Sequence, residues 1–452
     1  MKKSILPICI GIFLIASGCT KSDPDDNPSE TAHFKVTIEN IAPIRPFITS
    51  GVFNTPANDT EPGAATPGKK FEFTIDAGRS QRLSFATMLA ATNDLFYGPN
   101  GDGIKLYDDD GNPLSGEVTD QVYLWDAGTE VNEEPAIGPN TVTNQAGPDT
   151  GTDENGNVMA IADVTNGFAF DYPKVEEVVH VMLEHTTGTE FKVTIKDLST
   201  AVLKTSQGDR PAPLSPGVWV VYSGKNPLYT IGERDFGNGI EAIAEDGNAE
   251  PLGEYVMANT GVTYPASPGG WVVHEQGTNP LFTEGMPDYG DGIEAIAEDG
   301  NAAVLDPNIA SLDGEKSGAV FNKPVGSSSP GPILPGSKYE FNFEATSSDN
   351  LSFATMLAAT NDIFFAPKGE GIALFDTEGD PINGDITDQV YLWDSGTEVN
   401  EQPGLGPNTV TNQLAPDTGE EESQLVQLLS DVNDGFSYPA VNSVIKVTIT
   451  SN

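Results

Sequence analysis

The segment "LSFATMLAATND" occupies residues 83–94 and is repeated without a change at residues 351–362. Around it, residues 52–145 align with residues 320–413 without a gap, and "TDQVYLWD", "GTEVN" and "GPNTVTNQ" are identical in the two copies. Because an internal repeat of this length marks a structural unit that occurs more than once, the sequence predicts two homologous domains.

A shorter repeat lies between the two copies. "GIEAIAEDGNA" ends a segment that begins with "WVV" in both cases, and the two repeat units span residues 217–249 and 270–302. In chain order we expect a first domain at 33–187 and a second at 188–452, with both repeat units forming a duplicated lead section of the second domain.

Local patterns predict that both domains are all-β. "FKVTIEN" at 34–40 and "FEFTIDA" at 71–77 alternate apolar and polar residues, as half-buried strands do. The chain contains 48 Gly and 34 Pro, and words such as "DDDGNP" and "SPGG" indicate turns. We therefore expect two antiparallel β-sandwiches. "LSFATMLAA" fits both a strand and a helix, and its flanking strands favour a strand, whereas "GIEAIAEDG" predicts short helices that end at Gly247 and Gly300.

The charge is strongly one-sided. The chain has 67 Asp and Glu against 22 Lys and Arg, a formal net charge of −45. Nucleic acid is excluded as an expected partner, because binding to phosphates requires clustered basic residues. The same argument opposes electrostatic docking on anionic lipid. An acidic surface suits divalent cations, cationic partners or simple solubility.

The first residues predict an exported, lipid-anchored protein. Two lysines, an apolar run and small residues before Cys19 form a secretory signal at 1–18, and "IASGC" resembles the bacterial lipobox. The apolar run is too short to remain as a membrane span. Residues 19–32 read as a flexible acidic tether. The expected location is the bacterial cell envelope, at the outer membrane and displayed on the surface, with the lipid on Cys19 as the sole membrane contact.

Acidic residues follow the most apolar strand of each copy. Asp126 ends "VYLWD", and Gly128 allows the chain to turn so that Glu130 points to the same place; Asp394 and Glu398 repeat the pattern. Two carboxylates this close repel each other unless a proton or a cation intervenes. Calcium suits such a site because it accepts about six to eight oxygen ligands in flexible geometry. The alternative is that these acids cap loops and bind backbone amides.

"LSFATMLAATNDLFYG" followed by "LWDAGTEVN" resembles the spondin N-terminal domain family, and the resemblance covers residues 33–452. It implies a C2-like antiparallel β-sandwich that holds about one calcium ion per domain with acids at loop ends. The acid four residues after the Trp–Asp pair is usually Asp in that family and is Glu here, so it either binds the ion directly or holds a coordinating water. The implied metal ligands are Asp94, Asp126, Glu130, Asp362, Asp394 and Glu398.

Other groups of acids allow weaker hypotheses. "LYDDDGNPLSGE" places acids at several positions of an EF-hand loop, but its first position is Leu106 and a hairpin turn explains it better. The two "GIEAIAEDG" units either form a second cation site or present the solvated face of a short helix. Their acids are Asp235, Glu241, Glu245 and Asp246 in one unit and Asp288, Asp291, Glu294, Glu298 and Asp299 in the other.

The sequence favours binding over catalysis. It contains no HExxH, GxSxG or P-loop motif, and the histidines at 33, 180, 185 and 274 do not form a zinc pattern. We expect a calcium-binding, surface-anchored lipoprotein that acts as a non-enzymatic adhesion or ligand-binding module toward an extracellular protein or glycan. The alternatives are an envelope module that uses calcium only for stability and, less favoured, a polysaccharide-active hydrolase built on a carboxylate pair.

Overall fold

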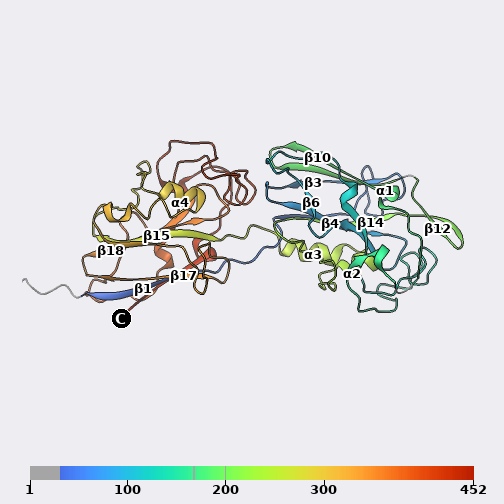
Figure 1. Ribbon diagram of the computed structural model, residues 1–452, viewed down its shortest axis with the longest axis horizontal. Helices are drawn as coiled ribbons and strands as arrows, with labels where there is room; N and C mark the ends of the chain where they lie inside the picture. The colour runs from blue at the N-terminus through green and yellow to red at the C-terminus, as the bar shows by residue number, and fades with distance from the viewer. Residues whose placement is uncertain (1–30, 166–167, 199) are drawn as a thin grey trace, which may run out of the picture.

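The computed structural model describes residues 31–165, 168–198 and 200–452 (Figure 1). The predicted signal peptide, Cys19 and nearly all of the tether lie outside these residues. Within the described ranges, no helix combines the length and the apolar character needed to cross a bilayer.

The chain forms two antiparallel β-sandwiches that lie side by side along the longest axis (Figure 1), which confirms the predicted all-β class. In the first sandwich, one sheet has the order β3 (Lys70–Asp76), β11 (Glu190–Asp197), β10 (Val179–Thr187) and β7 (Gly116–Glu117). The facing sheet has the order β2 (Thr49–Phe53), β14 (Leu214–Tyr222), β4 (Arg82–Leu89), β5 (Leu95–Pro99), β8 (Val122–Asp126) and β9 (Met159–Ala160), with β6 (Ile104–Lys105) paired to β4.

The second sandwich repeats this plan with other segments of the chain. One sheet has the order β17 (Lys338–Ala345), β1 (Ala32–Asn40), β24 (Ile445–Ser451) and β21 (Gly384–Asp385). The facing sheet has the order β16 (Glu315–Phe321), β15 (Ala266–Glu275), β18 (Asp349–Leu357), β19 (Ile363–Ala366), β22 (Tyr391–Asp394) and β23 (Gln427–Leu428), with β20 (Ile372–Ala373) paired to β18.

The remaining elements are short. Strands β12 (Val202–Thr205) and β13 (Gly208–Pro211) form a separate hairpin. The single-turn helices α1 (Val175–Val178) and α5 (Val441–Val444) precede β10 and β24. Five 3₁₀ turns among the described residues are Thr119–Gln121, Ile161–Asp163, Ile309–Ser311, Thr387–Gln389 and Leu429–Asp431.

Alternation along the strands builds both cores. Phe34, Val36 and Ile38 on β1 are almost completely buried, whereas the residues between them are partly exposed. Successive side chains of a strand point to opposite faces, so one face of β1 lines the core. The segment "LSFATMLAA" is a strand in both copies, β4 and β18, as its flanking strands predict.

Strand pairing differs from the predicted domain boundary between residues 187 and 188. Strand β1 pairs with β17 and β24 of the second sandwich, and β11 closes the first sandwich between β3 and β10. The core of the first sandwich uses residues 47–256, and that of the second uses residues 32–42 and 266–449. The two "FKVTI" strands have the same alternation, which specifies the buried face of a strand but not its partner.

The repeat units are likewise divided between the sandwiches. β14 and helix α2 (Ile240–Asp246) belong to the first sandwich, and β15 and helix α4 (Ile293–Asp299) belong to the second, which corrects the expectation of two units in one domain. Helices α2 and α3 (Glu250–Ala258) cover the outer face of the larger sheet of the first sandwich, and α4 covers that of the second. Gly247 and Gly300 end α2 and α4 with φ of 65°, which confirms the predicted C-caps.

The chain crosses between the sandwiches twice, and the crossings lie side by side (Figure 1). The amide of Gly261 donates to the carbonyl of Phe47 at 2.8 Å, and the amide of Arg45 donates to the hydroxyl of Thr263 at 2.7 Å. The first sandwich is therefore inserted between β1 and β15 of the second.

A loop of the first sandwich also docks on a loop of the second. Gln81 Nε2 donates to the carbonyl of Gly404 at 2.6 Å, and Ser80 Oγ donates to Asn412 Oδ1 at 2.7 Å. Asn412 is 3% exposed, whereas Asn144, at the same place in the identical "GPNTVTNQ" segment, is exposed. The docked loop is what distinguishes the surroundings of these two residues.

Candidate metal centres

Two aspartates of each sandwich meet because neighbouring strands begin and end there. Asp94 immediately precedes β5, and Asp126 is the last residue of β8, which pairs with β5 so that Leu95 lies opposite Asp126. Asp362 and Asp394 are brought together in the same way by β19 and β22, where Ile363 lies opposite Asp394. All four aspartates are at most 2% exposed.

A glycine turn closes around the first pair. Gly128 has φ of 71°, a conformation that side chains with a Cβ rarely adopt, and this lets the chain reverse directly after β8. Its amide donates to Asp126 Oδ1 at 2.8 Å and to Asp94 Oδ2 at 3.1 Å. The Thr129 hydroxyl donates to Asp94 Oδ1 at 2.7 Å. The alternative prediction that these acids bind backbone amides is confirmed for Asp94 and Asp126, and these bonds use only part of their oxygen lone pairs.

The pairs are costly to ionise. Burial, and then the nearby charge of Asp126, hold the pKa of Asp94 well above its usual value; burial and Asp394 act on Asp362 in the same way. Burial also raises the pKa of Asp126 to about 6. A buried carboxylate pair therefore favours either a proton or a bound cation between its oxygens.

A third acid joins the pair in the second sandwich, and the first sandwich has an acid at the matching position of the repeat. In the second sandwich, Asp362, Asp394 and Glu422 each offer an oxygen within 4.8 Å of the others. Asp94, Asp126 and Glu154 precede these residues by a constant 268 positions, and the charge of Glu154 acts on Asp126. We call these sets the strand-end clusters. Oxygens bound to one Ca²⁺ at 2.3–2.6 Å lie at most about 5 Å apart, so the spacing fits this ion.

Buried amide oxygens without partners lie beside these clusters. Asn132 donates a hydrogen bond from Nδ2 to Asp126 Oδ2, and Asn400 donates one to Asp394 Oδ2 at 2.5 Å. The Oδ1 atoms of Asn132 and Asn400 have no hydrogen-bond partner among the described residues, and Asn132 is 4% exposed. Neutral amide oxygens are common ligands of calcium, so these residues fit a cation bound at the strand ends.

The carboxylates of Glu130 and Glu398 are directed elsewhere. Glu130 Oε1 accepts from the amide of Gly151 at 2.6 Å, and Oε2 accepts from Asn93 Nδ2 at 3.1 Å. The backbone amide of Glu398, not its side chain, donates to Asp362 Oδ2 at 3.3 Å. Their carboxylates belong to two further groups, which we call the helix-side clusters: Glu130, Asp149 and Glu245, and Glu398, Asp417 and Glu298. The six ligands implied by the spondin resemblance are therefore divided between two kinds of cluster.

Four of the cluster residues carry a sequence signal that extends the repeat. The gapless offset of 268 positions continues past residue 145 and relates Asp149 to Asp417 and Glu154 to Glu422. Asp149 and Asp417 stand in an identical "PDTG" segment, and Glu154 and Glu422 keep their acid although the residues after them differ, which indicates a shared role. Glu245 and Glu298 were candidates within the "GIEAIAEDG" units, but no local pattern indicated their partners.

The other acids of those units have different roles. Asp235 Oδ2 accepts from the amide of Gly237, and Asp288 Oδ2 from that of Gly290, both at 2.7 Å. Asp246 accepts from Gln145 Nε2 at 2.8 Å. The turn prediction for "DDDGN" is also confirmed, since Asp108 Oδ1 accepts from the amides of Asp110 and Asn112 at 3.0 and 2.8 Å.

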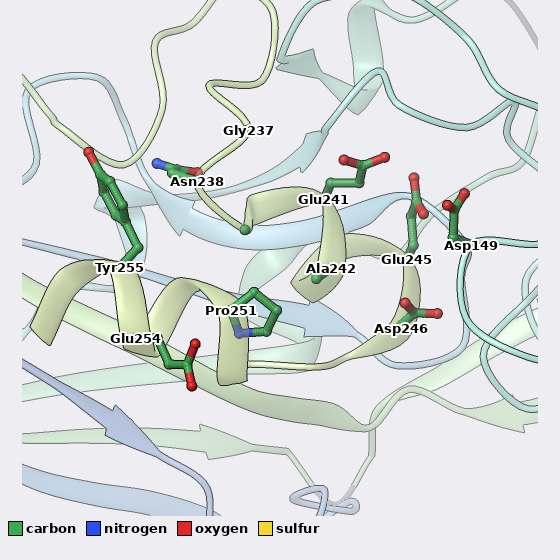
Figure 2. A pocket seen from close by; sticks show the side chains of 11 residues that line it. Asp149, Gly237, Asn238, Glu241, Ala242, Glu245, Asp246, Pro251, Glu254 and Tyr255 are labelled. Carbon is green, nitrogen blue, oxygen red and sulfur yellow. The ribbon is translucent and has the colours of Figure 1, made fainter. Parts of the chain in front are cut away.

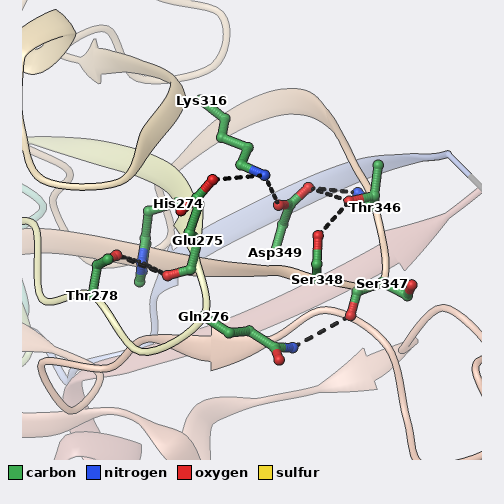
Figure 3. A network of polar contacts seen from close by, with 9 residues as sticks. All are labelled: His274, Glu275, Gln276, Thr278, Lys316, Thr346, Ser347, Ser348 and Asp349. Atoms are coloured by element: carbon green, nitrogen blue, oxygen red, sulfur yellow. Dashed lines mark hydrogen bonds and ion pairs between the residues drawn. The ribbon is translucent and has the colours of Figure 1, made fainter. Parts of the chain in front are cut away.

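His274 has structural contacts (Figure 3). Its buried ring contacts Ser352 Oγ through Nε2 and Thr278 Oγ1 through Nδ1, both at 3.0 Å. Burial lowers its pKa. Nearby, Lys316 Nζ lies 3.1 Å from Asp349 Oδ1 and 3.6 Å from Glu275 Oε1. These contacts hold the end of β15 against β16 and β18.

A scan against protein-family models finds no match for the chain. A search of curated proteins finds no significantly similar sequence. The resemblance to the spondin N-terminal domain therefore remains a prediction that depends on the quoted motifs.

Proposed function

We propose that this protein is a surface-anchored lipoprotein whose two sandwiches bind Ca²⁺ at the strand-end clusters and act as a non-enzymatic adhesion or ligand-binding module. The observation that carries the proposal is the meeting of buried aspartates at the same strand ends in both sandwiches. In the second sandwich, the oxygens of Asp362, Asp394 and Glu422 are also spaced as one Ca²⁺ requires.

The electrostatic surroundings support a cation. Among the residues that the structure describes, the ion pairs made by Lys and His side chains do not include Asp362, Asp394 or Glu422. Uncompensated buried carboxylates are strongly destabilising, so either a proton or a metal ion is needed. Calcium matches an all-oxygen set of carboxylates and amides better than softer metals do.

The position of the clusters suggests how a bound ion would serve adhesion. Each cluster joins the end of one strand to loops that run on to the next elements, for example from Asp394 through Glu422. A cation that neutralises these acids would hold the loops in one arrangement and so prepare a surface for a partner at lower entropic cost. Two such surfaces on one lipid-anchored chain would bind an extended protein or glycan with avidity.

Calorimetric titration with Ca²⁺ tests the proposal. The chain that begins after Cys19 is compared with Asp126→Asn plus Asp394→Asn, and with Asp120→Asn plus Asp388→Asn as a control that removes two exposed charges from equivalent positions outside the clusters. We expect the same binding heat and the same calcium-dependent rise in Tm for the parent and the control, whereas the first variant should lose the part of both that the strand-end clusters supply. An unchanged titration of the first variant would refute the metal assignment.

Glycan and matrix-protein arrays with and without Ca²⁺ test the second half of the proposal. Calcium-dependent retention that the Asp126→Asn plus Asp394→Asn variant loses is the expected result. A large rise in Tm without any retained partner would favour a purely structural role for calcium. Turnover of a polysaccharide that the same variant abolishes would favour the hydrolase.

A further inference from the structure

The helix-side clusters join one long loop of each sandwich to a helix. In the first sandwich, Glu130 and Asp149 both come from the loop between β8 and β9, and Glu245 comes from helix α2; each offers an oxygen within 4.8 Å of the others. Glu398, Asp417 and Glu298 repeat the arrangement in the second sandwich. Figure 2 shows the carboxylates of Glu245 and Asp149 side by side, with Glu241 one turn earlier on the helix.

The packing of helix α2 keeps the Glu245 side chain buried. Ile240, Ile243 and Ala244 are completely buried against the outer face of the larger sheet, and Gly247 ends the helix directly behind them. Glu245 itself is 2% exposed, and among the described residues its Oε1 has no hydrogen-bond partner. An unpartnered carboxylate oxygen held in this position costs free energy unless a ligand satisfies it.

The chemistry of the set favours a hard divalent cation. Three carboxylates carry more negative charge than one proton neutralises, and all the available ligand atoms are oxygens. We propose that each helix-side cluster is a second Ca²⁺ site, separate from the strand-end cluster, which connects the loops after β8 or β22 to helix α2 or α4.

The two sites of a sandwich are neighbours through one hydroxyl. Thr397 Oγ1 lies 2.6 Å from Glu298 Oε1 and 3.0 Å from Asp362 Oδ1, so a single side chain contacts both kinds of cluster. An ion in one site would reduce the negative potential that the acids of the other site experience. Two clusters in each of two sandwiches give an expected capacity of four Ca²⁺ per chain.

Equilibrium dialysis with radioactive Ca²⁺ on the full chain tests this capacity. We expect four bound ions for the parent and two for Glu245→Gln plus Glu298→Gln. Glu254→Gln plus Asp306→Asn, which removes two exposed acids near the same helices, serves as the matched control and should retain four. A second variant, Asp149→Asn plus Asp417→Asn, changes the same two clusters at residues that should not disturb folding. Both residues are exposed, and their φ angles of 51° and 55° are ones that Asn also tolerates. This variant should weaken two of the four sites at least tenfold.

Two results would overturn the second site. One is a parent that binds only two ions; the other is a Glu245→Gln plus Glu298→Gln variant that still binds four. Loss of all binding in that variant would equally contradict separate sites, because it would mean that the acids form one joint centre. The Asp126→Asn plus Asp394→Asn variant separates this inference from the proposed function, since it should remove the strand-end ions and leave the two helix-side ions.

Discussion

Asp197 and Asn40 occupy the same register position in the two sandwiches, opposite Val179 in β10 and opposite Ile445 in β24. Asn40 is fully satisfied: its Nδ2 donates to the carbonyls of Tyr264 and Ile333 at 2.9 and 3.0 Å, and its Oδ1 accepts from the amide of Ala42 at 2.9 Å. Asp197 is also completely buried, but neither of its carboxylate oxygens has a partner among the described residues. A side-chain amide can donate hydrogen bonds and an ionised carboxylate cannot, so this buried position satisfies Asn40 but leaves Asp197 without partners.

Asp197→Asn should therefore stabilise the protein. Burial raises the pKa of Asp197 to about 8, so the folded state binds a proton more tightly than the unfolded chain, in which the pKa is near 3.8. This contribution to stability is complete below the unfolded pKa and is lost as the pH rises through about 8. Removal of an unsatisfied buried group should gain about 1–3 kcal/mol above neutral pH. Urea denaturation of parent and variant at pH 5, 7 and 9 measures the gain, which should grow with pH.

The reciprocal substitution provides the control. Asn40→Asp places a buried acid that cannot donate against the carbonyls of Tyr264 and Ile333, and it should lower the free energy of unfolding, increasingly at higher pH. Equal stability of the Asp197→Asn variant and the parent at pH 9 would contradict the explanation, because it would show that the Asp197 carboxylate is satisfied in solution.

The strand-end clusters predict that the loss of their aspartates stabilises the metal-free protein and destabilises the calcium-bound protein. Asp126→Asn plus Asp394→Asn should raise the Tm in EDTA, because it removes a charge from each buried pair; the gain should be about 1–3 kcal/mol per sandwich. Asn132 can rotate its amide to accept from the new Asn, since its Oδ1 has no present partner. Thermal unfolding in EDTA and in millimolar Ca²⁺ checks this: the variant should be the more stable protein without calcium and the less stable one with it. The same order of Tm values in both buffers would contradict a cation site.

The contact between the sandwiches predicts that Gly78 is intolerant of substitution. A Cβ at residue 78 would lie 2.3 Å from Asn412 Nδ2, which is too close. It would displace the Asn412 side-chain amide, whose Oδ1 accepts from Ser80 Oγ. Gly78→Ala should separate the loop at 78–81 from the loop at 404–412, and small-angle scattering should show a larger radius of gyration. Gly63→Ala is the matched control because no atom lies within 4 Å of its added Cβ. An unchanged scattering profile for Gly78→Ala would show that the two loops are not docked in solution.

The sequence predicted the parts of the structure that depend on local periodicity. Alternation predicted β1, the flanking strands favoured a strand for the ambiguous β4 segment, and the helical pattern with its terminal glycine predicted α2. Asp94 and Asp126 were also predicted together, because the resemblance to the spondin N-terminal domain implies both as ligands of one ion. The contacts of the Glu130 side chain were not predictable. Its neighbours Asp149 and Glu245 lie more than 15 and more than 100 residues later in the chain. The choice of partner for each "FKVTI" strand was equally hidden, because both strands offer the same buried face.

That choice of partner provides the last prediction. Residues 188–452 were the expected second domain, but this fragment contains β11 and β14 of the first sandwich and lacks β1. Without β1 the second core loses Phe34, Val36 and Ile38, each worth about 1.5–3 kcal/mol of burial, and both β17 and β24 lose a paired edge. The fragment should therefore aggregate or remain unfolded. A chain in which residues 31–43 are joined by a short Gly-Ser linker to residues 263–452 should instead fold with a cooperative thermal transition, because Asn40 already contacts the carbonyl of Tyr264. Circular dichroism and gel filtration of the two fragments compare these outcomes, and a folded, monomeric 188–452 fragment would show that β11 can replace β1.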